Sequence, residues 1–166
     1  MSLYTPPPSV LTASKTTIGA LFHRRVPVQP QQTAVIDGDR SLNYAELDDR
    51  SNRLAQAILA MGLERGDRLA LLARNCMEYI EIELAAAKAG IIVAALNWRL
   101  ADRELQHSVQ LVEPKLIIVQ SDLAAALDRL NLPPCQRIVI GGDYENVLAN
   151  AHNSYCLLYT SDAADE

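Results

Sequence analysis

Residues 68–96 read RLALLARNCMEYIEIELAAAKAGIIVAAL, a stretch in which two short apolar runs flank a helical pattern. The first run, residues 69–73, is apolar at every position, which is typical of a strand covered by helices on both faces. The helical pattern ends at Gly90, a residue suited to the left-handed position after a helix, and residues 91–96 form the second run. The stretch therefore predicts a buried strand, a helix and a second buried strand.

Capping signals mark the start of two helices. Asn43 stands three residues before Glu46, and Asn75 stands three residues before Glu78. At this spacing the asparagine can accept a hydrogen bond from the backbone N–H of the glutamate, while the glutamate side chain bonds back to the cap. We expect one helix to begin after Asn43 and another after Asn75. We interpret Asn43, Glu46, Asn75 and Gly90 as residues that maintain the fold.

The helix that follows Asn43 is expected to run to Gly62 and to pack by one face. Its apolar stripe consists of Leu47, Leu54, Ile58 and Met61. The other side, which we expect to face water, carries Asp48, Asp49, Arg50 and Arg53. This division predicts a helix that covers one side of the core.

The remaining elements follow from the same patterns. We expect helices at residues 17–22, 102–112 and 121–130, the last capped by Ser121, and strands at residues 33–36, 41–42, 115–119 and 137–140. From about residue 67 to about residue 140 strands and helices alternate, which is the arrangement that gives a parallel sheet through right-handed crossovers. The predicted fold class is α/β.

Composition limits the classes of protein that the chain can represent. Its 166 residues are enough for one compact domain, and its formal net charge is -5 without a basic block, so nucleic-acid binding is not indicated. No apolar run approaches the roughly 20 residues of a transmembrane helix. Residues 1–15 are rich in Pro, Ser and Thr and lack the pattern of a secretory signal. We expect a loose leader and a cytoplasmic protein.

No group of residues indicates a metal site or an activated nucleophile. The cysteines lie far apart, at Cys76, Cys135 and Cys156. The histidines are His23, His107 and His152. His107 lies within a predicted helix and is expected to be solvated or packed, because no nucleophile with an orienting acid is evident nearby. We assign no catalytic, cofactor-binding or metal-binding residue in this chain.

Two polar residues deserve separate consideration because of their place in the predicted sheet. Asn97 and Arg99 come directly after residues 91–96, at the carboxyl end of a predicted parallel strand. Open α/β sheets often bind ligands at this edge. Contact with a substrate is one interpretation, and a hydrogen bond or ion pair that stabilises the fold is the one that we favour.

Four segments, taken in order, resemble the N-terminal subdomain of one enzyme family. They are residues 41–47 (SLNYAEL), 66–72 (GDRLALL), 87–90 (AKAG) and 96–100 (LNWRL). Together they are similar to the AMP-dependent synthetase and ligase family, the acyl-adenylate-forming enzymes. The resemblance implies that residues 16–150 are a partial, truncated N-terminal subdomain of that fold, a mostly parallel sheet flanked by helices. The last segment is more similar to acyl-CoA synthetases than to peptide-synthetase adenylation domains.

The resemblance implies a two-step reaction in the intact parent enzyme. A carboxylic acid reacts with Mg-ATP to give an acyl-adenylate and pyrophosphate, and CoA then displaces AMP. The first step needs a Ser/Thr/Gly-rich loop with a lysine to hold the phosphates. No such loop is present, because Gly141-Gly142 is too short and Tyr159-Thr160-Ser161 continues into acidic residues. We expect this chain to bind none of ATP, Mg or CoA and to be inactive.

The last 11 residues, 156–166, do not continue the α/β pattern. Their sequence, CLLYTSDAADE, matches one reading frame of a transposon-end adapter used in sequencing libraries, and we interpret it as a non-native, adapter-derived tail. Two other interpretations of the whole chain stay open. One is a small standalone α/β binding module, and the other is an inactive regulatory relative of the ligases.

Overall fold

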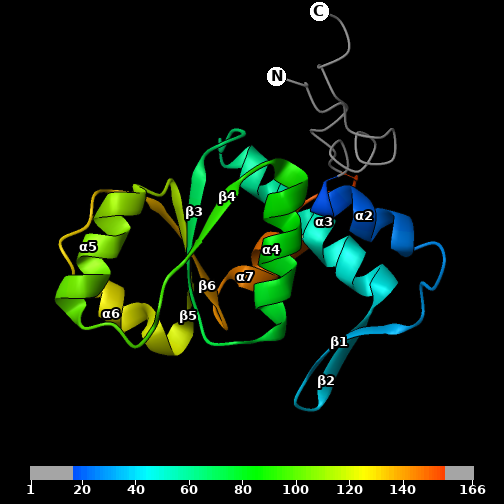
Figure 1. Cartoon of the computed structure of the whole chain (residues 1–166), viewed down its shortest axis with the longest axis horizontal. Coiled ribbons are helices and arrows are strands. Elements are labelled where there is room, and N and C mark those ends of the chain that lie inside the picture. The colour runs from blue at the N-terminus through cyan, green and yellow to red at the C-terminus, as the bar shows by residue number, and fades with distance from the viewer. Residues whose placement is uncertain (1–16, 156–166) are drawn as a thin grey trace, which may run out of the picture.

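Figure 1 shows the computed structural model, which describes residues 17–155. At its centre is a four-stranded parallel sheet with the strand order β4-β3-β5-β6. The strands are β3 (Arg68–Leu72), β4 (Ile92–Ala95), β5 (Leu116–Gln120) and β6 (Gln136–Ile140). The α/β class and the parallel sheet that the alternating pattern predicted are confirmed.

Helices cover both faces of the parallel sheet (Figure 1). One face carries α3 (Tyr44–Ala60), α4 (Met77–Ala89) and α7 (Tyr144–Asn150), and the other carries α5 (Asp102–Val112) and α6 (Ala124–Asp128). Successive residues of β3 point to opposite faces. Leu69 and Leu71 join the core under α3 and α4, while Ala70 and Leu72 join the core under α5. The run has no polar position because both faces are buried.

The strand β4 differs from its prediction as a buried strand. Among the described strands it pairs with β3 alone and forms one edge of the sheet, and Ile92 is 53% exposed. The chain places β4 on one side of β3 and then β5 on the other, so β3 and not β4 becomes interior. An apolar run predicts a strand without polar positions, but the crossover connections determine how many neighbouring strands it pairs with.

The N-terminal elements pack beside α3 and α4 (Figure 1). They are α2 (Ile18–Arg25) and an antiparallel hairpin of β1 (Thr33–Asp37) and β2 (Arg40–Asn43). The predicted capping box of α3 is confirmed. The Asn43 Oδ1 atom accepts a hydrogen bond from the Glu46 N–H at 2.9 Å, and the Asn43 N–H donates to Glu46 Oε2 at 2.8 Å. No helix within residues 17–155 is long and apolar enough to cross a bilayer.

The second predicted capping box is wrong. α4 begins after Cys76, one residue later than expected. The Cys76 side chain makes no cap hydrogen bond, and the Met77 N–H donates instead to Asp37 Oδ2 of β1 at 3.1 Å. Glu78 is buried and instead forms an ion pair with Arg40 of β2, with 2.7 Å between Oε1 and Nη1. The glutamate therefore has a partner from a distant part of the sequence, which the spacing between Asn75 and Glu78 cannot reveal. The predicted end of α4 is confirmed, since Gly90 has a φ of 70°.

The segment after β5 also departs from the prediction. Residues 121–130 were expected to form one helix capped by Ser121, but they form the 3-10 turn η1 (Ser121–Leu123) followed by the short helix α6. Ser121 lies inside η1, and no side chain caps either element. The helix α7 was not predicted, because its seven residues are too few to give a clear helical period.

The two asparagines at the predicted caps provide a matched test of this part of the fold. Replacing Asn43→Ala removes an observed cap and should lower the free energy of unfolding by about 0.5–2 kcal/mol. Replacing Asn75→Ala should change it little, because Asn75 is exposed and caps no helix. Urea unfolding followed by circular dichroism measures both. Equal losses for the two variants would contradict the assignment of the caps.

Candidate functional site

The carboxyl ends of the parallel strands meet at one edge of the sheet, where open α/β sheets commonly bind ligands. Arg74 follows β3, Asn97 and Arg99 follow β4, Gln120 ends β5, and Gly141 follows β6. The two residues that the sequence placed at this edge therefore do lie there. We take this edge as the candidate functional site and ask what its side chains can do.

Two guanidinium groups lie on the ring of Trp98 at the candidate site. The Cζ atom of Arg74 is 4.7 Å and that of Arg99 is 4.6 Å from the ring centroid. Trp98 is 36% exposed, so these are cation–π contacts at the protein surface. Arg74 also forms an ion pair with Asp122, and its backbone N–H donates to Gln120 Oε1 at 2.9 Å. The sequence analysis did not predict that Trp98 takes part in this site, although a single tryptophan directly before an arginine was a signal for a cation–π contact.

The side chain of Asn97 has a local structural role. Its Oδ1 atom accepts a hydrogen bond from the Arg99 backbone N–H at 3.0 Å, which closes a turn directly after β4. The interpretation that Asn97 stabilises the fold is therefore the one that the structure supports. For Arg99 the observed contact is with an aromatic ring rather than the hydrogen bond or ion pair that we expected.

The candidate site does not fit the triphosphate of ATP. A phosphate-binding loop needs free backbone N–H groups and usually a lysine at this edge. The lysines in the described part of the chain are elsewhere: Lys88 is buried, and Lys115 pairs with Asp67 at the amino edge of the sheet, with 2.7 Å between Nζ and Oδ2. The Gly142 N–H is used inside the turn after β6.

The buried ammonium of Lys88 joins α4 to α3. The Lys88 side chain is 0% exposed, and its Nζ atom donates to Asp48 Oδ1 at 2.8 Å, Ser51 Oγ at 2.7 Å and Asn52 Oδ1 at 2.8 Å. The prediction that Asp48 faces water is wrong, because its residue exposure is 8%. Asp48, Ser51 and Asn52 have i, i+3, i+4 spacing and so share one face of α3. That spacing was the signal that sequence reasoning missed.

A second, partly buried network joins α3 and α4 to α7. Arg50 Nε lies 2.7 Å from Glu81 Oε1, and Arg50 Nη2 lies 2.6 Å from Glu145 Oε1. The hydroxyl of Tyr144 donates to Glu81 Oε2 at 2.8 Å. Burial raises the pKa of the Glu81 carboxyl, and the Arg50 guanidinium opposes that shift. The predicted solvent side of α3 is therefore partly an interface, since Arg50 is half-buried.

Within residues 17–155 no group of three or more His, Cys, Asp or Glu side chains could hold a metal ion. His107 is exposed on α5, as expected, and His23 stacks on Tyr155 with ring centroids 3.6 Å apart. Cys76 and Cys135 are half-buried free thiols, and burial raises the pKa of Cys76 to about 11. A thiol with a raised pKa is a poor nucleophile at neutral pH. Cys156 lies outside the described residues.

A parallel sheet covered by helices on both faces, with polar side chains at the carboxyl ends of its strands, defines an open-sheet α/β protein. Comparison with known families identifies which open-sheet α/β proteins this chain is related to. The chain belongs to the family of AMP-binding enzymes, whose sequence profile matches residues 22–161. The resemblance found in the four sequence segments is confirmed.

Relatives in this family are acyl-CoA and fatty acid ligases. A fatty acid–[acyl-carrier-protein] ligase of Streptomyces coeruleorubidus is 33% identical over 115 residues, which cover 69% of this chain and 22% of that protein. A feruloyl-CoA synthase of an Amycolatopsis species is 35% identical over 150 residues, which cover 87% of this chain and 30% of that protein.

Solved structures give the same fold. A fatty acyl CoA synthetase of Mycobacterium tuberculosis superposes with a TM-score of 0.80 at 26% identity, and the match covers 87% of this chain and 30% of that protein. The fold is thus that of the N-terminal domain of acyl-CoA ligases. The chain spans 22% to 30% of the length of the three relatives described.

The Lys88 contacts predict a large effect for one substitution. Replacing Lys88→Met leaves the buried Asp48 carboxylate without its ammonium partner and should lower the free energy of unfolding by about 3–5 kcal/mol. Lys115→Met is the matched control, because the Lys115–Asp67 pair lies at the surface, and it should change stability little. Urea unfolding of both variants measures the difference. Similar stability of the two variants would show that Lys88 is not a stabilising contact.

The hydroxyl of Tyr144 predicts a pH-dependent effect. Burial, and then the nearby Glu81, raise the pKa of Tyr144 well above 10.0. Tyr144→Phe should lower the free energy of unfolding at about pH 8 by about 1–3 kcal/mol, because it removes a buried hydrogen bond. Because the pKa of Tyr144 is higher in the folded than in the unfolded protein, the stabilisation from its protonated hydroxyl is fully present below the unfolded pKa. That stabilisation is lost as the pH rises from the unfolded to the folded pKa.

The difference in the free energy of unfolding between the native protein and Tyr144→Phe should therefore become smaller above about pH 10, where the unfolded tyrosine loses its proton. Urea unfolding at several values between about pH 8 and about pH 11 measures this difference. A difference in the free energy of unfolding that stays constant over this range would contradict the raised pKa of Tyr144.

Proposed function

We propose that this chain is the N-terminal part of an ATP-dependent, AMP-forming carboxylate–CoA ligase. The observation that carries the proposal is the family match over residues 22–161, together with the fold shared with acyl-CoA synthetases. In the proposed reaction a carboxylate oxygen attacks the α-phosphorus of Mg-ATP and pyrophosphate leaves. The thiolate of CoA then attacks the acyl carbonyl and AMP leaves.

The substrates of the proposed enzyme are a fatty or other carboxylic acid, ATP with magnesium, and CoA. Support comes from relatives whose names refer to fatty acid and feruloyl ligases. A role in fatty acid metabolism and a cytoplasmic location belong to the same proposal. The reaction as proposed consumes ATP and CoA, which agrees with that location.

We propose further that residues 1–166 alone do not catalyse this reaction. The support is that residues 17–155 hold no phosphate-binding loop and that the only described lysines are buried or at the opposite edge of the sheet. The division into a leader at 1–15, a ligase domain at 16–150 and an adapter-derived tail at 156–166 is part of the proposal. The family match extends to residue 161 and so enters the proposed tail.

The proposal predicts different activities for two proteins. One is the chain of 166 residues, and the other is the product of the source gene when its reading frame is followed beyond Tyr155. Exchange of labelled pyrophosphate into ATP, measured with a panel of fatty and aromatic acids, should occur only with the longer product and only when an acid is present. Acid-dependent exchange by the chain of 166 residues would overturn its proposed inactivity.

The same assay tests the proposed class of enzyme. A longer product that forms acyl-AMP but no thioester with CoA would be an adenylating enzyme with another acceptor. A longer product that folds but exchanges no pyrophosphate with any acid would contradict the ligase assignment and favour an inactive relative.

A further inference from the structure

The helix α2 turns large apolar side chains towards solvent. It lies beside α3 and α4 at one end of the molecule (Figure 1). Ile18 and Leu21 of α2, and Val28 in the turn that follows it, are 57% to 70% exposed. Positions 18 and 21 are one turn apart and so lie on the same side of the helix. Three large apolar side chains therefore form one exposed surface within a short stretch of sequence.

This exposure does not come from a loosely held helix, because the other side of α2 is anchored. Gly19 lies so close to α4 that a Cβ atom there would be 3.1 Å from Lys88 Cγ. The ring of Phe22 stacks on that of Tyr44, with 5.8 Å between the ring centroids. These contacts fix the rotation of α2 about its own axis, and its apolar side remains turned outwards.

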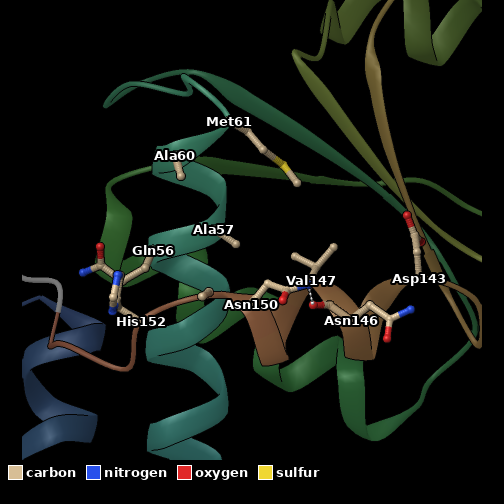
Figure 2. A pocket seen from close by; sticks show the side chains of 10 residues that line it. Gln56, Ala57, Ala60, Met61, Asp143, Asn146, Val147, Asn150 and His152 are labelled. Atoms are coloured by element: carbon tan, nitrogen blue, oxygen red, sulfur yellow. Dashed lines mark hydrogen bonds between the residues drawn. The ribbon is translucent and has the colours of Figure 1, made fainter.

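The segment after α7 adds a further contact to α2. Figure 2 shows this segment crossing α3 beside Gln56 and continuing towards α2. Gln56 Nε2 donates to the Ser154 carbonyl at 3.1 Å, and the ring of Tyr155 stacks on His23 of α2 with 3.6 Å between the ring centroids. The two ends of the described fold therefore hold each other in place.

The outward side of α2 also carries positive charge. Arg24 and Arg25 end the helix and are exposed. Arg25 comes four residues after Leu21, which places it on the same side, and Arg24 adjoins it. In the part of the chain that the structure describes, neither arginine pairs with an acid. Arg25 donates to the neutral Gln29 side chain. Both guanidinium groups thus keep their full charge for a partner.

The charge of this part of the sequence differs from that of the rest. Residues 1–36 contain Lys15, Arg24 and Arg25 and no Asp or Glu, whereas the whole chain has 15 Lys and Arg against 20 Asp and Glu. A single exposed apolar side chain is ordinary in a soluble protein. Several of them beside cations, with no acid nearby in the sequence, are typical of a segment that lies in the interface of a membrane.

We propose that the outer face of α2, formed by Ile18, Leu21, Arg24, Arg25 and Val28, binds the surface of an anionic lipid bilayer. The apolar side chains enter the boundary between headgroups and acyl chains, and the guanidinium groups contact lipid phosphates. The inference goes beyond the proposed function and does not depend on it, because binding needs neither ATP nor an acid. For a ligase of fatty acids, a bilayer is also where the free acids gather, since their acyl chains partition into it.

Sedimentation with lipid vesicles tests the proposal. The probes are vesicles of an equal mixture of phosphatidylglycerol and phosphatidylcholine, and vesicles of phosphatidylcholine alone. One double variant, Ile18→Ser with Leu21→Ser, removes the two apolar side chains of the helix. A second double variant, Arg24→Gln with Arg25→Gln, removes the charges. Because all four side chains are exposed, both variants should fold, which circular dichroism checks.

The matched control is a helix that exposes similar side chains among acids. α5 exposes Arg103 and Leu111, but Asp102 and Glu104 lie in its first turn. Arg103→Gln with Leu111→Ser removes one charge and one large apolar side chain and should leave vesicle binding unchanged. The chain of 166 residues and the longer gene product are both measured, because the outer face of α2 must be open in each.

Both native proteins should bind the anionic vesicles, and each α2 double variant should bind them about tenfold or more weakly. Binding to phosphatidylcholine alone should be weaker by a similar factor, and added salt should weaken binding to the anionic vesicles. Equal binding of the native proteins and the α2 variants would overturn the proposal. Failure of the native proteins to bind anionic vesicles at low salt would also overturn it and would favour an acidic protein as the partner. Binding by the chain of 166 residues alone would overturn it for the intact protein.

Pyrophosphate exchange, measured without vesicles, separates this proposal from the proposed function. The α2 variants of the longer product should keep the exchange rate of the native protein, because they change only the surface of α2. A longer product that binds vesicles but exchanges no pyrophosphate would support membrane binding and contradict the ligase assignment. Exchange without vesicle binding would support the ligase assignment and overturn membrane binding.

Discussion

The arrangement of α3 against α4 depends on the buried ammonium of Lys88. An ammonium group removed from water must be surrounded by oxygen acceptors, and α3 supplies Asp48, Ser51 and Asn52 from one face. These acceptors allow only a narrow range of positions for α4 along α3. Because α4 connects β3 to β4, the same contact also places the hydrophobic face of both helices over the sheet.

The second polar network extends this arrangement to the end of the described fold. Arg50 and Glu81 carry the connection from α3 and α4 to Tyr144 and Glu145 of α7. A short helix of seven residues has little stability of its own, so its position depends on these tertiary contacts.

The carboxyl edge of the sheet has a different character from this buried polar interior. Arg74 and Arg99 lie on the face of Trp98, and the backbone N–H groups of Arg74, Arg99 and Gly142 donate to acceptors within the fold. The residues between 17 and 155 thus provide a framework and an edge with cationic and aromatic side chains. The family match covers less than a third of each relative described.

The sequence alone determined the α/β class, the parallel strands and the start of α3. Each rests on local chemistry: a run without polar positions, an alternating order of elements, and the reciprocal hydrogen bonds of Asn43 and Glu46. It also determined the family, through short segments read in order, and it placed Asn97 and Arg99 at the correct edge.

Only the tertiary structure decided which polar residues are buried and which strand lies at the edge. Asp48 looked like a solvent residue because its partner Lys88 is 40 positions away in the sequence. Glu78 looked like a capping residue until Arg40 was found beside it, and β4 looked buried until the strand order left Ile92 at the edge. Local patterns report what a residue can do, whereas burial and pairing depend on segments that meet only when the chain has folded.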